Sequence, residues 1–301
     1  MKQFMDEVRT RMPGLDIRQQ EPMSRHTTFR VGGPAELYAS PDRGELAALL
    51  ALAKEAAVPV TVIGNGSNLL VGDKGIFGLV VEIGERMSAV RVEKECIVAQ
   101  AGALLSAAAQ TAAAAGLGGM EFAAGIPGSV GGAVVMNAGA YGGEMKDILK
   151  SALVLAEDGT LSELEGPELS LGYRHSCVPE RGYIVVEAAL SLERKAQEEV
   201  RARMAELREQ RVKKQPLEYP SAGSTFKRPQ GYYAGKLIMD AGLSGYTVGG
   251  AQVSEKHCGF VINRGDATAA DIRQLMRDVQ DRVRERFGVE LEPEVKLLGS
   301  F

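Results

Sequence analysis

The segment 125–143 constrains the fold most, because it holds seven glycines in 19 positions, too many for the interior of a helix or a strand. It also contains Ile126, Val130 and Val134, apolar residues that favour burial and argue against a flexible linker. We therefore predict a loop that other parts of the protein, or a ligand, hold in place.

The residues before this loop have the pattern of an αβ domain. A strand at 35–39, a helix that starts at Ser40-Pro41 and reaches Ala57, and a buried strand at 58–63 predict a right-handed βαβ unit with parallel strands. A helix at 104–115 should end at Gly116. Further strands are predicted at 78–83, 89–93, 96–101, 152–156, 161–164 and 183–192, with a hairpin turn at Asp158-Gly159.

The last third has the pattern of a smaller αβ domain. A charged helix at 196–214 stops before Gln215-Pro216, which is the most plausible domain boundary. A helix at 235–241 and a strand at 259–263 follow. Thr268 should cap a long helix that ends at Gly288, and a strand at 291–298 closes the chain.

Composition limits the classes of function. The 301 residues are 45% hydrophobic and 25% charged, as in ordinary globular proteins, and the net charge of −4 gives no general attraction for nucleic acid or anionic lipid. Three cysteines without metal or redox spacing favour a reducing compartment. No signal peptide or membrane-spanning run is recognisable, so we predict a cytoplasmic protein without membrane insertion.

A second glycine loop, 64–68, follows a predicted strand but lacks the third glycine and the helix of a dinucleotide-binding fingerprint. It can still form a nest of backbone amides around an anion, with Ser67 and Asn68 as extra donors; a plain turn is the alternative. Together with the loop at 125–143, it suits a diphosphate-bearing cofactor.

Other kinds of site are disfavoured. The three histidines, His26, His175 and His257, lack partners at ligand spacing, so we predict no metal site. No serine-hydrolase motif is present. Ser224 lies in basic surroundings and is a candidate for proton transfer, although a solvated loop beside a charged helix is the simpler interpretation.

At these residues the sequence resembles the UDP-N-acetylenolpyruvoylglucosamine reductase family along nearly its whole length. The matching blocks lie at 26–33, 64–71, 121–132, 136–141, 173–176, 220–227 and 291–295. So many blocks in the same order make the resemblance specific.

The resemblance implies an α+β fold of the vanillyl-alcohol-oxidase type (PCMH-type) with two FAD-binding subdomains and a smaller αβ substrate-binding domain. The predicted ranges are 1–85, 86–205 together with the C-terminal strand 290–301, and 206–289. FAD would be held non-covalently, and the residues implied in holding it are Gly64, Asn65, Gly66, Ser67, Asn68, Gly125, Ile126, Pro127, Gly128, Ser129, Gly132, Asn137, Gly139 and Tyr141.

The resemblance also implies a reaction in which NADPH, as co-substrate, reduces UDP-N-acetylglucosamine enolpyruvate to UDP-N-acetylmuramate for peptidoglycan. Arg174 would polarise the substrate carboxylate, Ser224 would donate a proton, and Glu294 would assist beside the carboxylate. Substrate-binding positions would be Tyr173, Arg211, Lys214, Lys227, Arg228 and His257. Arg228 and Ser244 depart from the family pattern, which leaves open which groups hold the diphosphate.

Two rival functions remain. One is an alcohol or hydroxy-acid oxidase on the same flavin fold, and the other is a nucleotide-sugar sensor without catalysis. The match at Ser224 and Glu294 argues against the oxidase, and the joint presence of Arg174, Ser224 and Glu294 argues against the sensor. We expect a small-molecule substrate, no nucleic acid and no obligate protein partner.

Overall fold

The computed structural model describes residues 1–301, which pack as two compact units. Unit 1 comprises Met1–Arg18, Leu37–Asn65 and Gly78–Arg211. Unit 2 comprises Gln19–Glu36, Gly66–Phe77 and Val212–Phe301. The three-domain division made from the sequence stays a prediction.

The first layer of unit 1 contains helices α1 (Lys2–Arg11) and α2 (Arg43–Glu55) and a four-stranded sheet. The sheet order is β1 (Asp16–Pro22), β2 (Pro34–Ser40), β5 (Ile76–Glu82) and β3 (Val60–Ile63), with β3 parallel to β5. The boundaries between the units cut β1, β2 and β5. Strand β3 lies at the edge of the sheet, and for that reason only Ile63 of its four residues is buried, contrary to the predicted buried strand.

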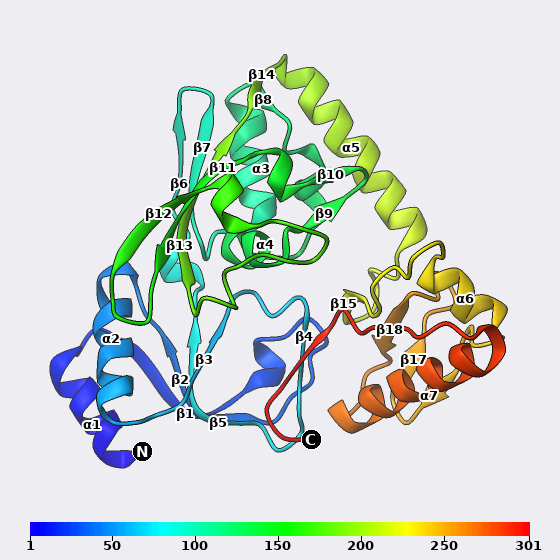
Figure 1. Cartoon of the computed structure of the whole chain (residues 1–301), viewed down its shortest axis with the longest axis horizontal. Coiled ribbons are helices and arrows are strands. Elements are labelled where there is room, and N and C mark those ends of the chain that lie inside the picture. The colour runs from blue at the N-terminus through cyan, green and yellow to red at the C-terminus, as the bar shows by residue number, and fades with distance from the viewer. The chain divides into compact units, whose positions relative to one another are not determined.

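The second layer of unit 1 is an antiparallel sheet with helices α3 (Leu105–Ala114) and α4 (Val130–Met136) packed against it (Figure 1). Its strand order is β12 (Leu161–Glu165), β11 (Leu149–Leu155), β13 (Ile184–Ser191), β7 (Cys96–Gln100) and β6 (Val90–Glu93). Short pairs add β8 (Leu117–Gly118) to β14 (Glu193–Arg194) and β9 (Gly139–Ala140) to β10 (Gly143–Glu144). Helix α5 (Gln197–Lys214) leaves this layer and ends before Gln215-Pro216, as predicted.

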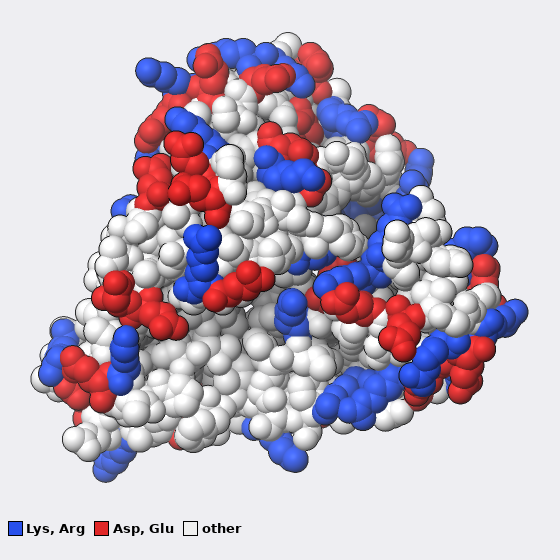
Figure 2. Space-filling model, in the orientation of Figure 1, with Lys and Arg blue, Asp and Glu red and all other residues white.

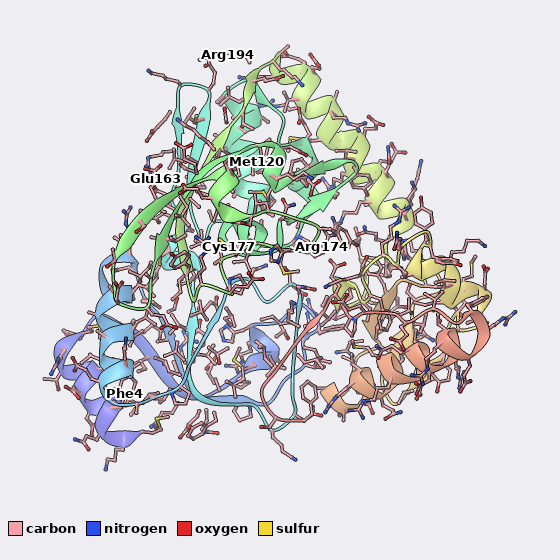
Figure 3. All side chains as sticks on the ribbon, in the orientation of Figure 1. Phe4, Met120, Glu163, Arg174, Cys177 and Arg194 are labelled. Atoms are coloured by element: carbon pink, nitrogen blue, oxygen red, sulfur yellow. The ribbon has the colours of Figure 1, made fainter.

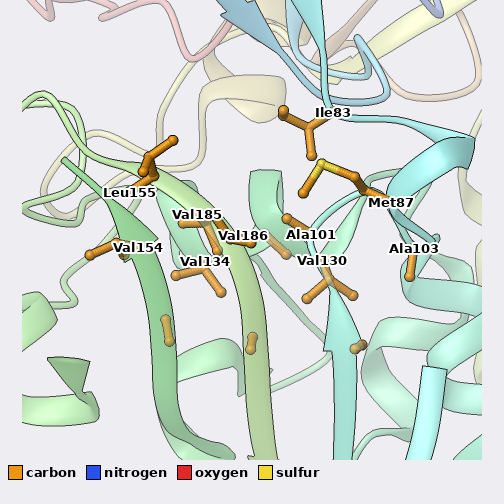
Figure 4. Packing of buried hydrophobic residues seen from close by; sticks show 14 of the residues in the cluster. Ile83, Met87, Ala101, Ala103, Val130, Val134, Val154, Leu155, Val185 and Val186 are labelled. Carbon is orange, nitrogen blue, oxygen red and sulfur yellow. The ribbon is translucent and has the colours of Figure 1, made fainter. Parts of the chain in front are cut away.

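The core of unit 1 is formed by small and branched apolar side chains. Val130 and Val134 on α4, Val154 and Leu155 on β11, and Val185 on β13 converge in this core (Figure 4). All five side chains are buried. Helix α4 is therefore fixed to the sheet by close packing of apolar side chains.

The presence of α4 corrects the prediction that all of 125–143 is loop. Ser129 caps the helix and accepts a bond from the Gly132 amide (3.4 Å), while Val130 and Val134 bury one face. A Cβ on Gly131 would lie 2.8 Å from the Cβ of Ala101. The glycine thus serves close packing between helix and sheet, a need that propensity alone does not reveal.

Unit 2 is a four-stranded sheet packed against a long helix. The sheet order is β15 (Ser221–Ser224), β18 (Phe260–Asn263), β17 (Ala251–Val253) and β16 (Thr247–Val248). Helix α7 (Ala269–Phe287) packs on β16, β17 and β18, and α6 (Ala234–Asp240) contacts α7. Thr268 caps the helix as predicted and forms a capping box with Asp271, and Gly288 ends the helix in the left-handed conformation.

The C-terminal strand pairs differently from the prediction. β19 (Lys296–Leu298) lies parallel to β4 (Leu69–Val71) in unit 2, whereas the prediction grouped 290–301 with the subdomain 86–205 and named no partner strand. The helix start at Ser40-Pro41 is also wrong. Asp42 caps α2 instead, because its carboxylate accepts bonds from the amides of Gly44 and Glu45, and Glu45 completes a capping box.

A capping change tests the local account of α7. The Thr268 hydroxyl accepts a hydrogen bond from the Asp271 amide (3.1 Å) at an exposed helix end. We expect Thr268→Ala to lower the free energy of unfolding by about 1 kcal/mol. Thr268→Asn, which can still cap the helix, should retain most of it. Urea titration followed by circular dichroism measures both, and equal losses in the two variants would contradict the capping role.

The surface of unit 1 mixes both signs of charge. Acidic and basic side chains intermingle over the sheet that carries β6 and β12 (Figure 2), and the pairs include Arg91–Glu187 (2.7 Å) and Arg194–Glu95 (3.4 Å). Arg91 lowers the pKa of Glu187, chiefly through their hydrogen bond. None of the helices has both the length and the apolar character needed to cross a membrane.

Candidate functional site

The two glycine loops meet within unit 1. A Cβ on Gly64 would lie 2.5 Å from the Ser129 Oγ, and the Asn65 side-chain amide donates to the Pro127 carbonyl at 2.6 Å. Two segments more than 60 residues apart in the chain are thereby joined at the start of α4. The sequence predicted two separate nests. In the structure the start of the 64–68 loop contacts the 125–132 loop.

The loop at 125–132 is held rigidly from one side. Leu105 N–H donates to the Gly128 carbonyl, Val130 N–H donates to Ala103, and Gly131 N–H donates to Ala101. By contrast, the amides of Asn65, Gly128 and Ser129 donate to no acceptor in the chain. A rigid loop of small residues whose backbone amides have no acceptor within the chain can donate hydrogen bonds to a phosphate group.

The residue at the end of α4 is hydrogen-bonded to a later turn that carries Arg174. Asn137, the residue after the helix, is left-handed with φ 42°. Its side-chain amide donates to the Gly172 carbonyl (2.9 Å) and to Glu144 (2.6 Å). Arg174 and Cys177 lie on the segment between β12 and β13 (Figure 3).

The turn itself presents two large side chains. Gly172 and His175 exchange backbone hydrogen bonds, which leaves Tyr173 and Arg174 at the tip. The Arg174 guanidinium lies 5.2 Å from the centre of the Tyr173 ring, and Tyr173 is 55% exposed. The aromatic face favours a cation at this position.

Arg211, near the end of α5, is a half-buried cation beside the glycine loop at 125–132. A Cβ on Gly125 would lie 3.1 Å from its Cδ and 3.4 Å from its Nη1. Burial lowers the pKa of Arg211, and Tyr141 nearby opposes that shift. No acidic side chain contributes to this pKa shift of Arg211. A partly desolvated guanidinium without an acidic partner is suited to an anionic ligand.

Ser224 and Glu294 come from neighbouring segments of unit 2. Ser224 pairs with Phe260 at the end of β15, and the next residue, Thr225, accepts at its carbonyl from the Glu294 amide (2.9 Å). Phe226 and Pro293 extend this antiparallel contact. Two segments about 70 positions apart in the sequence are thus paired through their backbones.

Thr225 is the residue that fixes this arrangement, and the sequence analysis missed it. Its side chain is buried, its amide donates to the Gly259 carbonyl (2.8 Å), and its hydroxyl accepts from the Val261 amide (2.9 Å). Successive side chains of a strand point to opposite faces, so a Ser224 that faces the ligand could have indicated that Thr225 faces inward.

The C-terminal end of the glycine loop at 64–68 belongs to unit 2. The Asn68 side-chain amide donates to the Glu294 carbonyl at 3.0 Å, and Lys296 N–H donates to the Asn68 carbonyl. Gly66, with φ 60°, packs so closely that a Cβ would lie 1.9 Å from the His26 carbonyl. Asn68 therefore fixes Glu294, a contact that its predicted cofactor role did not include.

Two of the predicted substrate-binding cations of unit 2, Lys227 and Arg228, already have local partners. Lys227 pairs with Glu292, and the Arg228 guanidinium lies 3.9 Å from the centre of the Tyr233 ring. Lys214, the last residue of α5, is exposed. The basic surroundings expected for Ser224 are thus partly neutralised by local partners.

His257 has a defined tautomer. Its Nδ1 accepts from the Gly259 amide at 3.1 Å, and burial lowers its pKa. The neutral ring therefore carries its proton on Nε2, where it can act as a donor. Tyr173, Arg174 and Arg211 lie in unit 1, whereas Ser224, Glu294, Lys227, Arg228 and His257 lie in unit 2.

Two family models match the chain. A model described as FAD binding domain matches residues 36–165. A model described as UDP-N-acetylenolpyruvoylglucosamine reductase, C-terminal domain, matches residues 215–298. The matches confirm the predicted FAD-binding fold with a smaller C-terminal domain.

Relatives match over nearly the full length. The chain is 60% identical over 310 residues to a UDP-N-acetylenolpyruvoylglucosamine reductase of Agathobacter rectalis, covering 99% of each protein. It is 52% identical to that of Caldanaerobacter subterraneus subsp. tengcongensis, covering 93% of each. The crystal structure of the reductase from Thermus caldophilus superposes with a TM-score of 0.81 at 38% identity, covering 95% of this chain and 99% of that one. The chain therefore belongs to the UDP-N-acetylenolpyruvoylglucosamine reductase family.

Proposed function

We propose that the chain catalyses the NADPH-dependent, FAD-mediated reduction of UDP-N-acetylglucosamine enolpyruvate to UDP-N-acetylmuramate, a step of peptidoglycan precursor synthesis. Family membership supports the activity. The observation that supports the assignment of residues is the antiparallel backbone contact between the segment that carries Ser224 and the segment that carries Glu294.

The joined glycine loops fit FAD. The diphosphate would accept hydrogen bonds from backbone amides of Gly64, Asn65 and residues 125–132 that have no acceptor within the chain. The rest of the predicted set is Gly66, Ser67, Asn68, Gly139 and Tyr141. Bound FAD would supply hydride transfer from NADPH to the enolpyruvyl group. The protein supplies binding, orientation and electrostatics.

Arg174 holds the substrate carboxylate. Hydride addition to the vinyl carbon leaves negative charge on the carbon next to that carboxylate. A fixed guanidinium stabilises this charge as it develops, and its planar fork matches a carboxylate. The turn closed by Gly172 and His175 carries Arg174 in the left-handed backbone conformation.

Ser224 donates the proton to the carbon that carries the charge. A neutral hydroxyl is a weak acid, and it suffices only because the acceptor is a strongly basic carbanion-like centre. Glu294 is held through its backbone by Thr225 and Asn68, and it assists at the substrate carboxylate.

The nucleotide part is bound by cations and donors. Arg211 and Lys214 at the end of α5 take the diphosphate, with Lys227 and Arg228 adding positive charge. Tyr173 and the Nε2–H of His257 offer an aromatic face and a hydrogen-bond donor.

Absorbance spectroscopy tests the function directly. We expect the purified protein to be yellow and to release FAD, not FMN, on denaturation. NADPH under anaerobic conditions should bleach the flavin absorbance, and the enolpyruvyl sugar should restore it. Recovery with oxygen alone would favour an oxidase, and sugar binding without bleaching by NADPH would favour a sensor.

We further propose that the enzyme works in the cytoplasm without an obligate protein or nucleic-acid partner. Its three cysteines are unpaired, which suits a reducing compartment.

A further inference from the structure

We propose that Asn137 is a positioning residue for the turn that carries Arg174, and that it acts on the reaction through Arg174 and not through the cofactor. The inference rests on the proposed function, because it takes Arg174 to hold the substrate carboxylate.

The side chain of Asn137 is fully used within the protein. It is 0% exposed, its two amide hydrogens go to Gly172 and Glu144, and its carbonyl accepts from the Lys146 amide (2.9 Å). An asparagine offers two donors in these directions and one carbonyl acceptor. Little of the side chain is left to contact FAD, although its sequence block implied that role.

The turn that Asn137 contacts needs outside support. Arg174 is left-handed, with φ 54°, a conformation that costs a non-glycine residue energy and persists only when its surroundings impose it. The Gly172 carbonyl accepts both from His175 N–H (3.2 Å), which closes the turn, and from Asn137. The amide of Asn137 thus fixes the closing residue.

The other end of the turn is tied to the same helix end. The Ser176 hydroxyl donates to the Val135 carbonyl at 2.7 Å, and Ser176 is buried. Val135 and Asn137 therefore hold the turn from both sides. Because α4 starts at Ser129 in the glycine loop, one short helix links the predicted cofactor loop to Arg174.

An amide is required at position 137 for an electrostatic reason. Asn137 donates to the carboxylate of Glu144, so Asn137→Asp would place two carboxylates against each other. Asparagine also tolerates the left-handed backbone better than other side chains. Asn137→Gly is the most direct test, because glycine keeps the left-handed backbone conformation and removes the carboxamide together with its three hydrogen bonds.

We expect Asn137→Gly to retain FAD and to be bleached by NADPH at the native rate. Recovery of absorbance with the enolpyruvyl sugar should slow by about 10-fold to 100-fold, since misplacing a group by about 1 Å has effects of that order. Ser170→Gly is the matched control: Ser170 is also left-handed (φ 50°) in unit 1, but it is exposed and its side chain makes no hydrogen bond. It should behave as the native protein.

A double-mutant cycle decides whether Asn137 acts through Arg174. In an Arg174→Ala background, Asn137→Gly should slow recovery by no more than about twofold further. The proposal would be overturned if the double variant slowed recovery by the product of the two single effects. Loss of FAD, or equal slowing of bleaching and recovery, would also overturn it. If Asn137→Gly does not fold, Ser176→Ala should give the same selective slowing. A native protein whose colour the sugar does not restore would instead refute the proposed function.

Discussion

Replacing Ser224 by alanine should leave bleaching of the flavin by NADPH unchanged and slow its recovery with the enolpyruvyl sugar by 10² or more, about 2.7 kcal/mol of barrier. The hydroxyl supplies a proton only after hydride has reached the substrate. Stability should barely change, because Ser224 is a half-buried residue at a strand end and its β-pairing with Phe260 is a backbone contact. Stopped-flow absorbance measures both steps.

Two further variants make this result specific. Ser224→Cys should recover part of the rate, since a thiol still carries a transferable proton. Ser221→Ala makes the same chemical change at the other end of β15 and should leave both steps unchanged. If Ser224→Ala slows bleaching and recovery equally, the serine positions the flavin or the sheet and donates no proton.

Replacing Arg211 by methionine should have opposite effects on binding and stability. The variant keeps the aliphatic stem over Gly125 and loses the cation, so we expect KM for the enolpyruvyl nucleotide to rise by about 10²-fold, near 2.7 kcal/mol. The free energy of unfolding should stay equal or rise, because burial already disfavours the charged form of Arg211. Steady-state kinetics and thermal denaturation of the apoprotein measure the two quantities.

The matched control is Arg208→Met, one turn earlier on α5, where the arginine is exposed. It should change neither quantity by more than a small factor. Loss of FAD from Arg211→Met, with KM for the sugar unchanged, would reassign Arg211 to the cofactor. A large drop in stability would show that its guanidinium has a structural role in unit 1.

Local signals predicted much of the fold. The Thr268 cap, the Gly288 stop and the hairpin at Asp158-Gly159 are visible over a few residues, and the structure has all three. The D-x-x-E pattern of Asp42 and Glu45 was equally readable, but Ser40-Pro41 was a stronger-looking start and misled the prediction.

Long-range contacts were not predictable in the same way. Helix α4 forms inside a glycine-rich segment because Gly131 must approach Ala101, 30 residues earlier in the chain. The pairing of β19 with β4 spans most of the sequence, and no local pattern encodes it. For the site, the family blocks selected the residues, but only the structure showed that Asn68 contacts Glu294 and that Asn137 contacts Gly172.

The pairing of β19 with β4 also determines the order in which the chain can fold during synthesis. Unit 1 contains no residue beyond Arg211, so all of its segments have emerged from the ribosome while the last third is still being made. Unit 2 must wait, because β4 and the amide of Asn68 find their partners only at Lys296–Leu298 and Glu294. Until then the edge of β4 and the buried face of Leu70 are exposed, and this interval is when the nascent chain is most prone to aggregation and most dependent on chaperones.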